Sequence, residues 1–179
     1  MLLDDGSMEN LKALEVGARK LERQGNRPQA VLAFWKLAQL LASCHMFAQA
    51  VEMYEKSAEL CLELQWFAQR AQRLRSAAEL ADMMGNIRLC ADLLKDAALG
   101  YDKAANQDRN EARKACYKRA AREMRRRSAC AYAAKGLYWR AGTLFRDAAV
   151  ISSPQRQDND DWDTLVQNRV DAVVAFAYA

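Results

Sequence analysis

The sequence predicts an all-α protein, a right-handed stack of antiparallel helical hairpins (an α-solenoid) with about seven main helices. The first observation is a turn that recurs at four places, and the second is the pattern that follows it. A small residue comes five positions after each turn residue, and a large apolar residue comes nine positions after it. The turn residues are Gly25, His45, Gly85 and Gly136; the small residues are Ala30, Ala50, Cys90 and Ala141; the large ones are Phe34, Tyr54, Leu94 and Phe145. Such a period is typical of stacked helical repeats.

The composition favours helix over strand. Of the 179 residues, 51% are hydrophobic, yet Val, Ile and Thr are scarce while Ala, Leu, Arg, Lys, Glu and Gln are abundant. The abundant residues have high helix propensity, whereas β-branched residues favour strands. A chain of this length suits one domain or one continuous array with a substantial core.

The first helices are placed by apolar spacing and by the turns that end them. Residues 1–8 are expected to be disordered or a remnant of cloning, and the helical-repeat array is expected over residues 9–152. Its first helix ends before Gly25, because apolar side chains recur at helical spacing up to that point. Pro28 suits the first turn of the next helix, since its missing N–H costs no hydrogen bond there. That helix is expected to end near residue 43, and others are expected at about 47–64, 67–84 and 87–105.

The turn spacing sets the repeat length. Gly25, His45 and Gly85 fit a step of 20 residues per helix, and Gln65-Trp66 fills the vacant slot. Two helices per unit therefore give a repeat of about 40 residues. Gly136 lies 51 residues after Gly85, so the helix before it must be longer. That helix is expected at about 109–135 with Asp108 as its N-cap, followed by one at about 137–152.

The rest of the chain differs in composition. Residues 153–163 are expected to form an acidic linker, and residues 164–179 a C-terminal helix. The segment Asp158–Asp163 lacks the glycine and the final glutamate of an EF-hand calcium loop, so a solvated linker is expected. Its docking against a basic helix of the array is the alternative. The apolar end of the chain indicates a fragment of a longer protein, or a surface covered by a partner or a second copy in a homo-oligomer.

The run from Leu37 to Leu60 resembles a tetratricopeptide hairpin. Small residues that let two helices approach closely alternate with an aromatic residue that fills the gap to the next helix. The residues that carry the resemblance are Leu37, Ala38, Leu41, Ala50, Tyr54, Ser57 and Ala58. The resemblance covers about residues 11–152, and the longer repeat of about 40 residues is similar to that of the soluble NSF attachment proteins. It implies an adaptor that binds other proteins, and no functional residue is carried over.

Tetratricopeptide domains that clamp chaperone carboxylates place an asparagine just after the small residue of the first helix. The corresponding residues of this chain are Arg19, Gln39, Glu79 and Cys130. A clamp of that design is therefore not expected.

The sequence gives little indication of an enzyme. No catalytic residue, metal site or cofactor is expected. His45, the only histidine, is expected to be a turn residue, because adjacent helix residues diverge too far for a dyad with Cys44. The five cysteines form no Cys-x-x-Cys pair and are expected to be reduced core residues of a cytoplasmic protein. They are Cys44, Cys61, Cys90, Cys116 and Cys130. No apolar run reaches the length of about 20 residues that a membrane span needs.

The long helix near residues 109–135 carries the candidate partner-binding site. One broad face is predicted to be almost purely basic, and the opposite face, which includes Ala112, Cys116 and Met124, is predicted to pack. The basic residues are Lys114, Lys118, Arg119, Arg122, Arg125 and Arg126. Two interpretations are open. The basic residues are a solvated face or pair with acids of neighbouring helices, or they contact an acidic protein, a phosphate-bearing lipid or RNA. RNA is less favoured, because the net charge is only +4 and no aromatic residues interleave with the arginines.

These observations favour a non-enzymatic protein–protein interaction adaptor or scaffold, of the kind used in trafficking or complex assembly. It would bind a helical or extended segment of another protein. Two alternatives stay open: an RNA-associated helical-repeat protein that uses the basic helix, and a structural subunit of a larger assembly.

Overall fold

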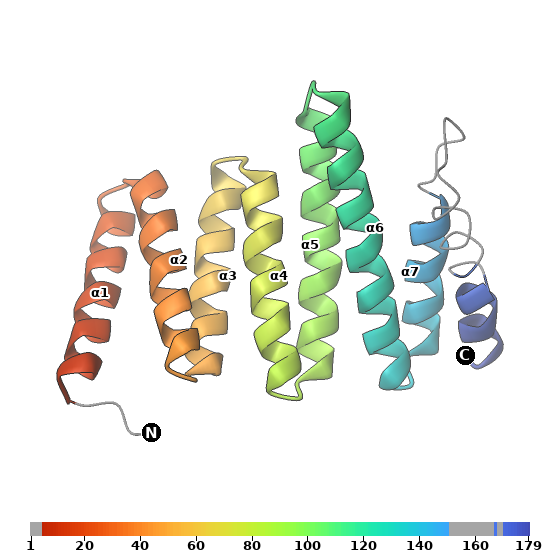
Figure 1. The fold of residues 1–179 in the computed structure, drawn as a ribbon, viewed down its shortest axis with the longest axis horizontal. Coiled ribbons are helices and arrows are strands. Elements are labelled where there is room, and N and C mark those ends of the chain that lie inside the picture. Colours follow the sequence, from red (N-terminus) through yellow and green to blue (C-terminus); the bar gives the residue numbers. More distant parts are fainter. Residues whose placement is uncertain (1–4, 151–166, 168–169) are drawn as a thin grey trace. The chain divides into compact units, whose positions relative to one another are not determined.

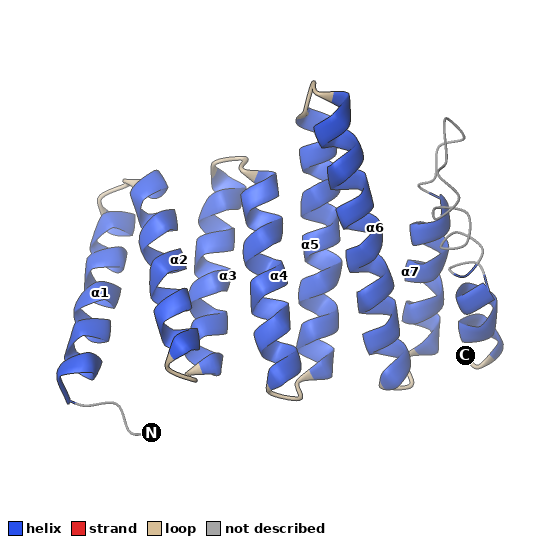
Figure 2. Ribbon diagram, viewed as in Figure 1, coloured by secondary structure: helices blue, strands red, loops and turns tan. Residues whose placement is uncertain are grey.

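The computed structural model describes residues 5–150, 167 and 170–179. Within these ranges the backbone forms only helices and turns, which confirms the all-α prediction (Figure 2). The chain divides into two compact units, Met1–Gly85 and Asn86–Ala179. No helix in the described ranges is both long enough and apolar enough to cross a membrane.

The first unit is a row of four helices in which each packs against the next in sequence (Figure 1). The helices are α1 (Asp5–Arg23), α2 (Arg27–Ser43), α3 (Phe47–Glu63) and α4 (Phe67–Met83). The pair α2–α3 is the hairpin that resembles a tetratricopeptide unit. Helix α1 begins at Asp5, earlier than the predicted start near residue 9, and an acidic residue is favourable at a helix N-terminus.

The second unit contains α5 (Ile87–Gln107), α6 (Glu111–Ala134) and α7 (Tyr138–Val150), with α6 packed against both of the others. A short helix over residues 170–177 follows. The ring centre of its Phe176 lies 5.2 Å from that of Trp139. Phe176 also packs closely on Gly142, where an added Cβ atom would lie 2.8 Å from the ring. The predicted acidic linker, residues 153–163, lies outside the described residues. Apolar side chains at the chain end are exposed, at Val170, Val173, Val174 and Tyr178.

Within the described part of the chain, five helices end in a residue with positive φ, a conformation that favours glycine. The angles are 72° at Gly25, 60° at His45, 58° at Gln65, 70° at Gly85 and 72° at Gly136. The predicted series of turns is therefore confirmed, including the one at Gln65. The backbone N–H of the residue that follows then donates a hydrogen bond back to the helix, as that of Trp66 does to the carbonyl of Cys61 at 2.8 Å. This pair of features is the Schellman helix end.

The connection between α5 and α6 corrects one prediction. Asp108 does not cap α6; it ends α5, and its side chain accepts a hydrogen bond from the backbone N–H of Asn110 at 2.8 Å. Asn110 is the N-cap, and its side chain accepts from the backbone N–H of Arg113 at 3.0 Å. Both residue types cap helices well, so propensity alone could not separate them.

The core confirms the packing register. All four small residues after the turns and all four large apolar residues that follow them are buried, and Ala30, Ala50 and Ala141 have no exposed surface. Two buried serines show how closely the helices approach. Ser57 of α3 donates to the carbonyl of Val31 in α2 at 2.9 Å, and Ser128 of α6 donates to that of Ala91 in α5 at 2.6 Å.

Candidate partner-binding groove

The face through which α6 packs is only partly the one predicted: Met124 is buried as expected, but three other residues are not where they were placed. Arg125 is 8% exposed, although it was expected on the solvated face. Ala112 and Cys116 are exposed, although both were expected to pack. Arg125, Arg126 and Arg127 are consecutive and diverge by about 100° each, so a helix with neighbours on two sides must turn one of them inward. The residues that α6 buries are Ala121, Met124, Arg125, Ser128, Ala129 and Tyr132.

The same shift corrects the prediction for the cysteines. Cys61 and Cys90 are buried, Cys44 is half-buried, and Cys116 and Cys130 are exposed. All five are free thiols in the structure. The expectation of a core position holds for Cys61 and Cys90, and the two exposed cysteines belong to α6, whose buried face was partly misplaced.

The buried Arg125 pairs with Asp102 of α5 through both guanidinium Nη atoms and both carboxylate oxygens. Its position in the repeat is otherwise apolar. Arg125 lies eleven residues before the positive-φ residue Gly136, and the equivalent residues of α2, α3 and α4 are Phe34, Tyr54 and Leu74. Those three side chains are buried. An arginine is tolerated in this core position because a carboxylate from the preceding helix, α5, compensates its charge.

The other basic residues of the predicted site have different environments. Lys114 pairs with Glu111 at 3.3 Å, and the Arg126 guanidinium donates to Glu123 at 3.1 Å. The hydrogen bond to Glu123 raises the pKa of Arg126. These acids lie three residues earlier on the same helix, a spacing that brings side chains together. Lys118 and Arg122 are half-buried and Arg119 is exposed.

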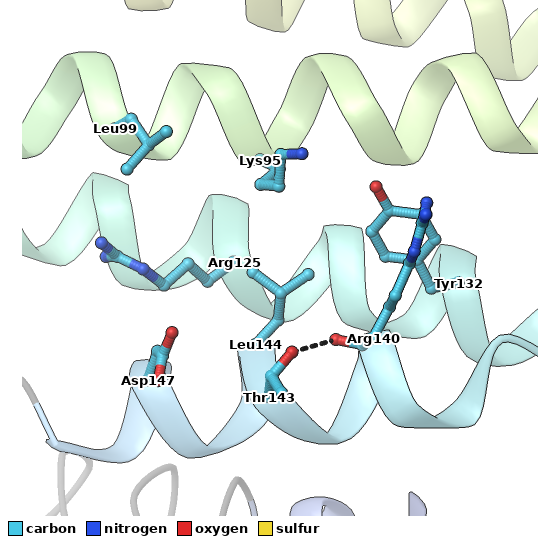
Figure 3. A pocket seen from close by; sticks show the side chains of 8 residues that line it. All are labelled: Lys95, Leu99, Arg125, Tyr132, Arg140, Thr143, Leu144 and Asp147. Carbon is cyan, nitrogen blue, oxygen red and sulfur yellow. Dashed lines mark hydrogen bonds between the residues drawn. The ribbon is translucent and has the colours of Figure 1, made fainter. Parts of the chain in front are cut away.

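A groove of about 480 Å³ lies over α6, between α5 and α7 (Figure 3). Its side chains come from one face of each helix, at spacings of three, four or seven residues. They are Lys95 and Leu99 from α5, Arg125 and Tyr132 from α6, and Arg140, Thr143, Leu144 and Asp147 from α7. Figure 3 shows Tyr132 and Arg140 at one end, Lys95 and Leu144 in the middle, and Leu99, Arg125 and Asp147 at the other end.

Hydrogen bonds and ring contacts fix the end of the groove at Tyr132. The Tyr132 hydroxyl donates to the Asp92 carboxylate, and the Arg140 guanidinium lies 5.7 Å from the centre of the Tyr132 ring. Burial, reinforced by the bond to Asp92, raises the pKa of Tyr132 to about 12. The hydroxyl is therefore a neutral donor at neutral pH. Thr143 donates to the Arg140 carbonyl at 2.8 Å, which leaves its side chain locally satisfied.

The groove combines apolar contact with charge at both ends. Leu99 and Leu144 supply apolar surface, Lys95 and Arg140 supply donors, and Asp147 supplies an acceptor. Lys95 lies 3.9 Å from Asp92 and Asp147 lies 3.4 Å from Arg146, and these exposed pairs are weak enough to exchange partners. Among the described residues no group of three or more His, Cys, Asp or Glu could hold a metal ion.

Of the residues predicted as a binding site, the groove includes only Arg125. Sequence reasoning missed the residues from α5 and α7. Within each helix the groove residues are spaced to lie on one face, as Lys95 and Leu99 are on α5 and Arg140 and Leu144 are on α7. Many other residues of the chain have the same spacing. Only the packing of three successive helices selects these faces.

No family model matches the sequence, and no curated protein matches it significantly. Among solved structures, the crystal structure of BtubC (BKLC) from P. vanneervenii is similar to this chain. The identity is 17%, the match covers 98% of this chain and 85% of that chain, and the TM-score is 0.40.

Proposed function

We propose that this protein is a non-enzymatic adaptor that binds a segment of another protein in the groove over α6. The observation that carries the proposal is the set of apolar and charged side chains from three successive helices that line one groove. Helical-repeat proteins use such continuous surfaces to bind extended or helical segments.

The lining defines the chemistry of the segment. A carboxylate would pair with Arg140 and Lys95, an apolar side chain would pack between Leu99 and Leu144, and a basic side chain would pair with Asp147. Arg140 and Asp147 are seven residues apart on α7, which is about 10 Å along the helix. That distance is spanned by about three residues of an extended peptide or by two helical turns. Charges of opposite sign at the two ends would orient the segment.

The basic residues of α6 would extend this surface. Arg125 lies in the groove, and Lys118 is one heptad before it, so both belong to the same side of the helix. Lys118, together with Lys114, Arg119, Arg122 and Arg126, would attract an acidic partner and act chiefly on its association rate, because charges near the surface are screened over about 8–10 Å.

The proposal can be tested with a displayed library of random dodecapeptides selected on the full chain. Binding of the selected peptides would be measured by fluorescence anisotropy for the wild type, Arg140→Glu and the control Arg88→Glu, which makes the same charge change at an exposed site on α5. Arg140→Glu should weaken binding about tenfold or more, and the control should change it less than twofold.

Two results would overturn the proposal. One is equal binding to the wild type and Arg140→Glu by every selected peptide. The other is binding of generic single-stranded RNA, with a steep salt dependence, by a chain that selects no peptide. The second result would favour the RNA-associated alternative.

A further inference from the structure

The first unit contains an arginine held against a tryptophan. The Arg73 guanidinium carbon of α4 lies 4.2 Å from the centre of the Trp35 ring of α2, which is a cation–π distance. Both side chains are half-buried. Tyr54 and Cys61 of α3, between these two helices, are close enough to Arg73 to influence its charge.

Arg73 has no acidic partner among the described residues. Its Nε atom is buried and forms no hydrogen bond in the structure. Burial lowers the pKa of Arg73, and the groups that oppose this effect are Cys61 and Tyr54. Burial also raises the pKa of both of these groups, so they are neutral at pH 7 and provide no counter-charge.

Other arginines of the same unit are treated differently. Arg27 pairs with Glu63 and Arg75 with Glu79, although both arginines are more exposed than Arg73, and the half-buried Arg19 pairs with Glu15. A guanidinium that is partly removed from water without a carboxylate raises the free energy of the folded protein. Because the Trp35 ring lies against the guanidinium and its Nε atom is buried, a ligand would have to bind the edge formed by the two Nη groups. That edge matches a planar carboxylate.

The position of the site in the repeat supports a binding role. Trp35 lies ten residues after the positive-φ residue Gly25, and Lys95 of the groove lies ten residues after Gly85. Tyr54 and the groove residue Arg125 each lie eleven residues before the next positive-φ residue. The surface over α3 is therefore equivalent, by register, to the groove over α6. Tryptophan and arginine are also the residues most enriched in the energetic centres of protein interfaces.

We propose that Arg73 and Trp35 form a second binding site, which takes the side-chain carboxylate of an aspartate or glutamate in a protein partner. The inference rests on the proposed function, since it assumes that the array binds polypeptide. It concerns a different unit and different residues, so the two can fail separately.

The test uses the same displayed dodecapeptide library on the full chain, with peptides that still bind Arg73→Gln removed. The retained peptides should share an acidic position. Because the selection keeps only peptides that Arg73→Gln no longer binds, the informative variant is Trp35→Leu, for which the affinity should fall about tenfold or more. The matched control is Arg75→Gln, which removes the same charge from an exposed position two residues along α4, and it should change affinity less than twofold. Circular dichroism melting shows that each variant is folded.

A second measurement does not depend on the protein variants. Replacing the shared acid of the peptide with Asn or Gln should weaken binding to the wild type about tenfold or more. Three results would overturn the inference: no retained peptide, retained peptides without a shared acid, or equal loss with Arg75→Gln. Displacement of the peptide by millimolar inorganic phosphate, but not by acetate, would also overturn it and would indicate a phosphate site. Peptides sensitive to Arg140→Glu and insensitive to Arg73→Gln would support the groove over α6 alone.

Discussion

The ion pair between Arg125 and Asp102 gives the sharpest test of how the second unit is held together. Asp102→Ala would leave the Arg125 guanidinium buried without a counter-charge. Breaking a buried pair from one side costs about 3–5 kcal/mol. The Arg125 side chain is 10% exposed and that of Asp102 is 27% exposed, so water reaches part of the site and the lower figure, about 3 kcal/mol, applies.

Replacing the arginine should have the opposite outcome. Arg125→Met inserts an apolar side chain into a position that α2, α3 and α4 fill with Phe34, Tyr54 and Leu74. Asp102 would remain partly hydrated, and replacing buried charges with apolar residues is often neutral or stabilising. We expect Arg125→Met to lie within about 1 kcal/mol of the wild type, or to be more stable.

Thermal unfolding followed by circular dichroism measures both effects. For a chain of this size, about 3 kcal/mol corresponds to a fall in melting temperature of about 6–12 °C. Hydrogen exchange should show faster exchange in α5 and α6 and no change in α1–α4. Asp82→Ala, which removes an exposed acid from α4, is the control and should cause no loss. Two results would refute this account of the ion pair. One is an equal melting temperature for Asp102→Ala and the wild type, and the other is an Arg125→Met variant as destabilised as Asp102→Ala.

Two further predictions concern the turns and the groove. Gln65→Gly should raise the free energy of unfolding by about 0.5–1 kcal/mol in a urea titration, because Gln65 has a φ of 58° that glycine adopts without strain; a loss of stability would contradict this account of the turn. The folded pKa of Tyr132, about 12, lies above its ordinary value of 10.0, so its contribution to stability is complete below pH 10 and is lost as the pH rises through about 12. Over that window the unfolding free energy of the wild type should fall by about 1–3 kcal/mol relative to Tyr132→Phe, and parallel curves for the two proteins would show that Tyr132 titrates normally.

The sequence by itself determined the helices and their turns, because these depend on local interactions. Gly25, Gly85 and Gly136 mark positions where the backbone needs positive φ, and their spacing located the same turn at Gln65 even without a glycine. The buried positions of Ala50 and Phe34 followed from the same period. When successive helices repeat the same contacts at a step of 20 residues, the buried positions of each helix can be predicted from the sequence.

Only the tertiary structure decided which face of α6 is buried and which residues share a groove. The charge pattern placed Arg125 in solvent, yet the neighbouring helix supplies Asp102 at the one place where an arginine must point inward. The stack of Arg73 on Trp35 joins α4 to α2, two helices that are not consecutive. Whether a charge on a helix is solvated, paired or left without a counter-charge depends on side chains far away in the sequence, and only packing brings those side chains together.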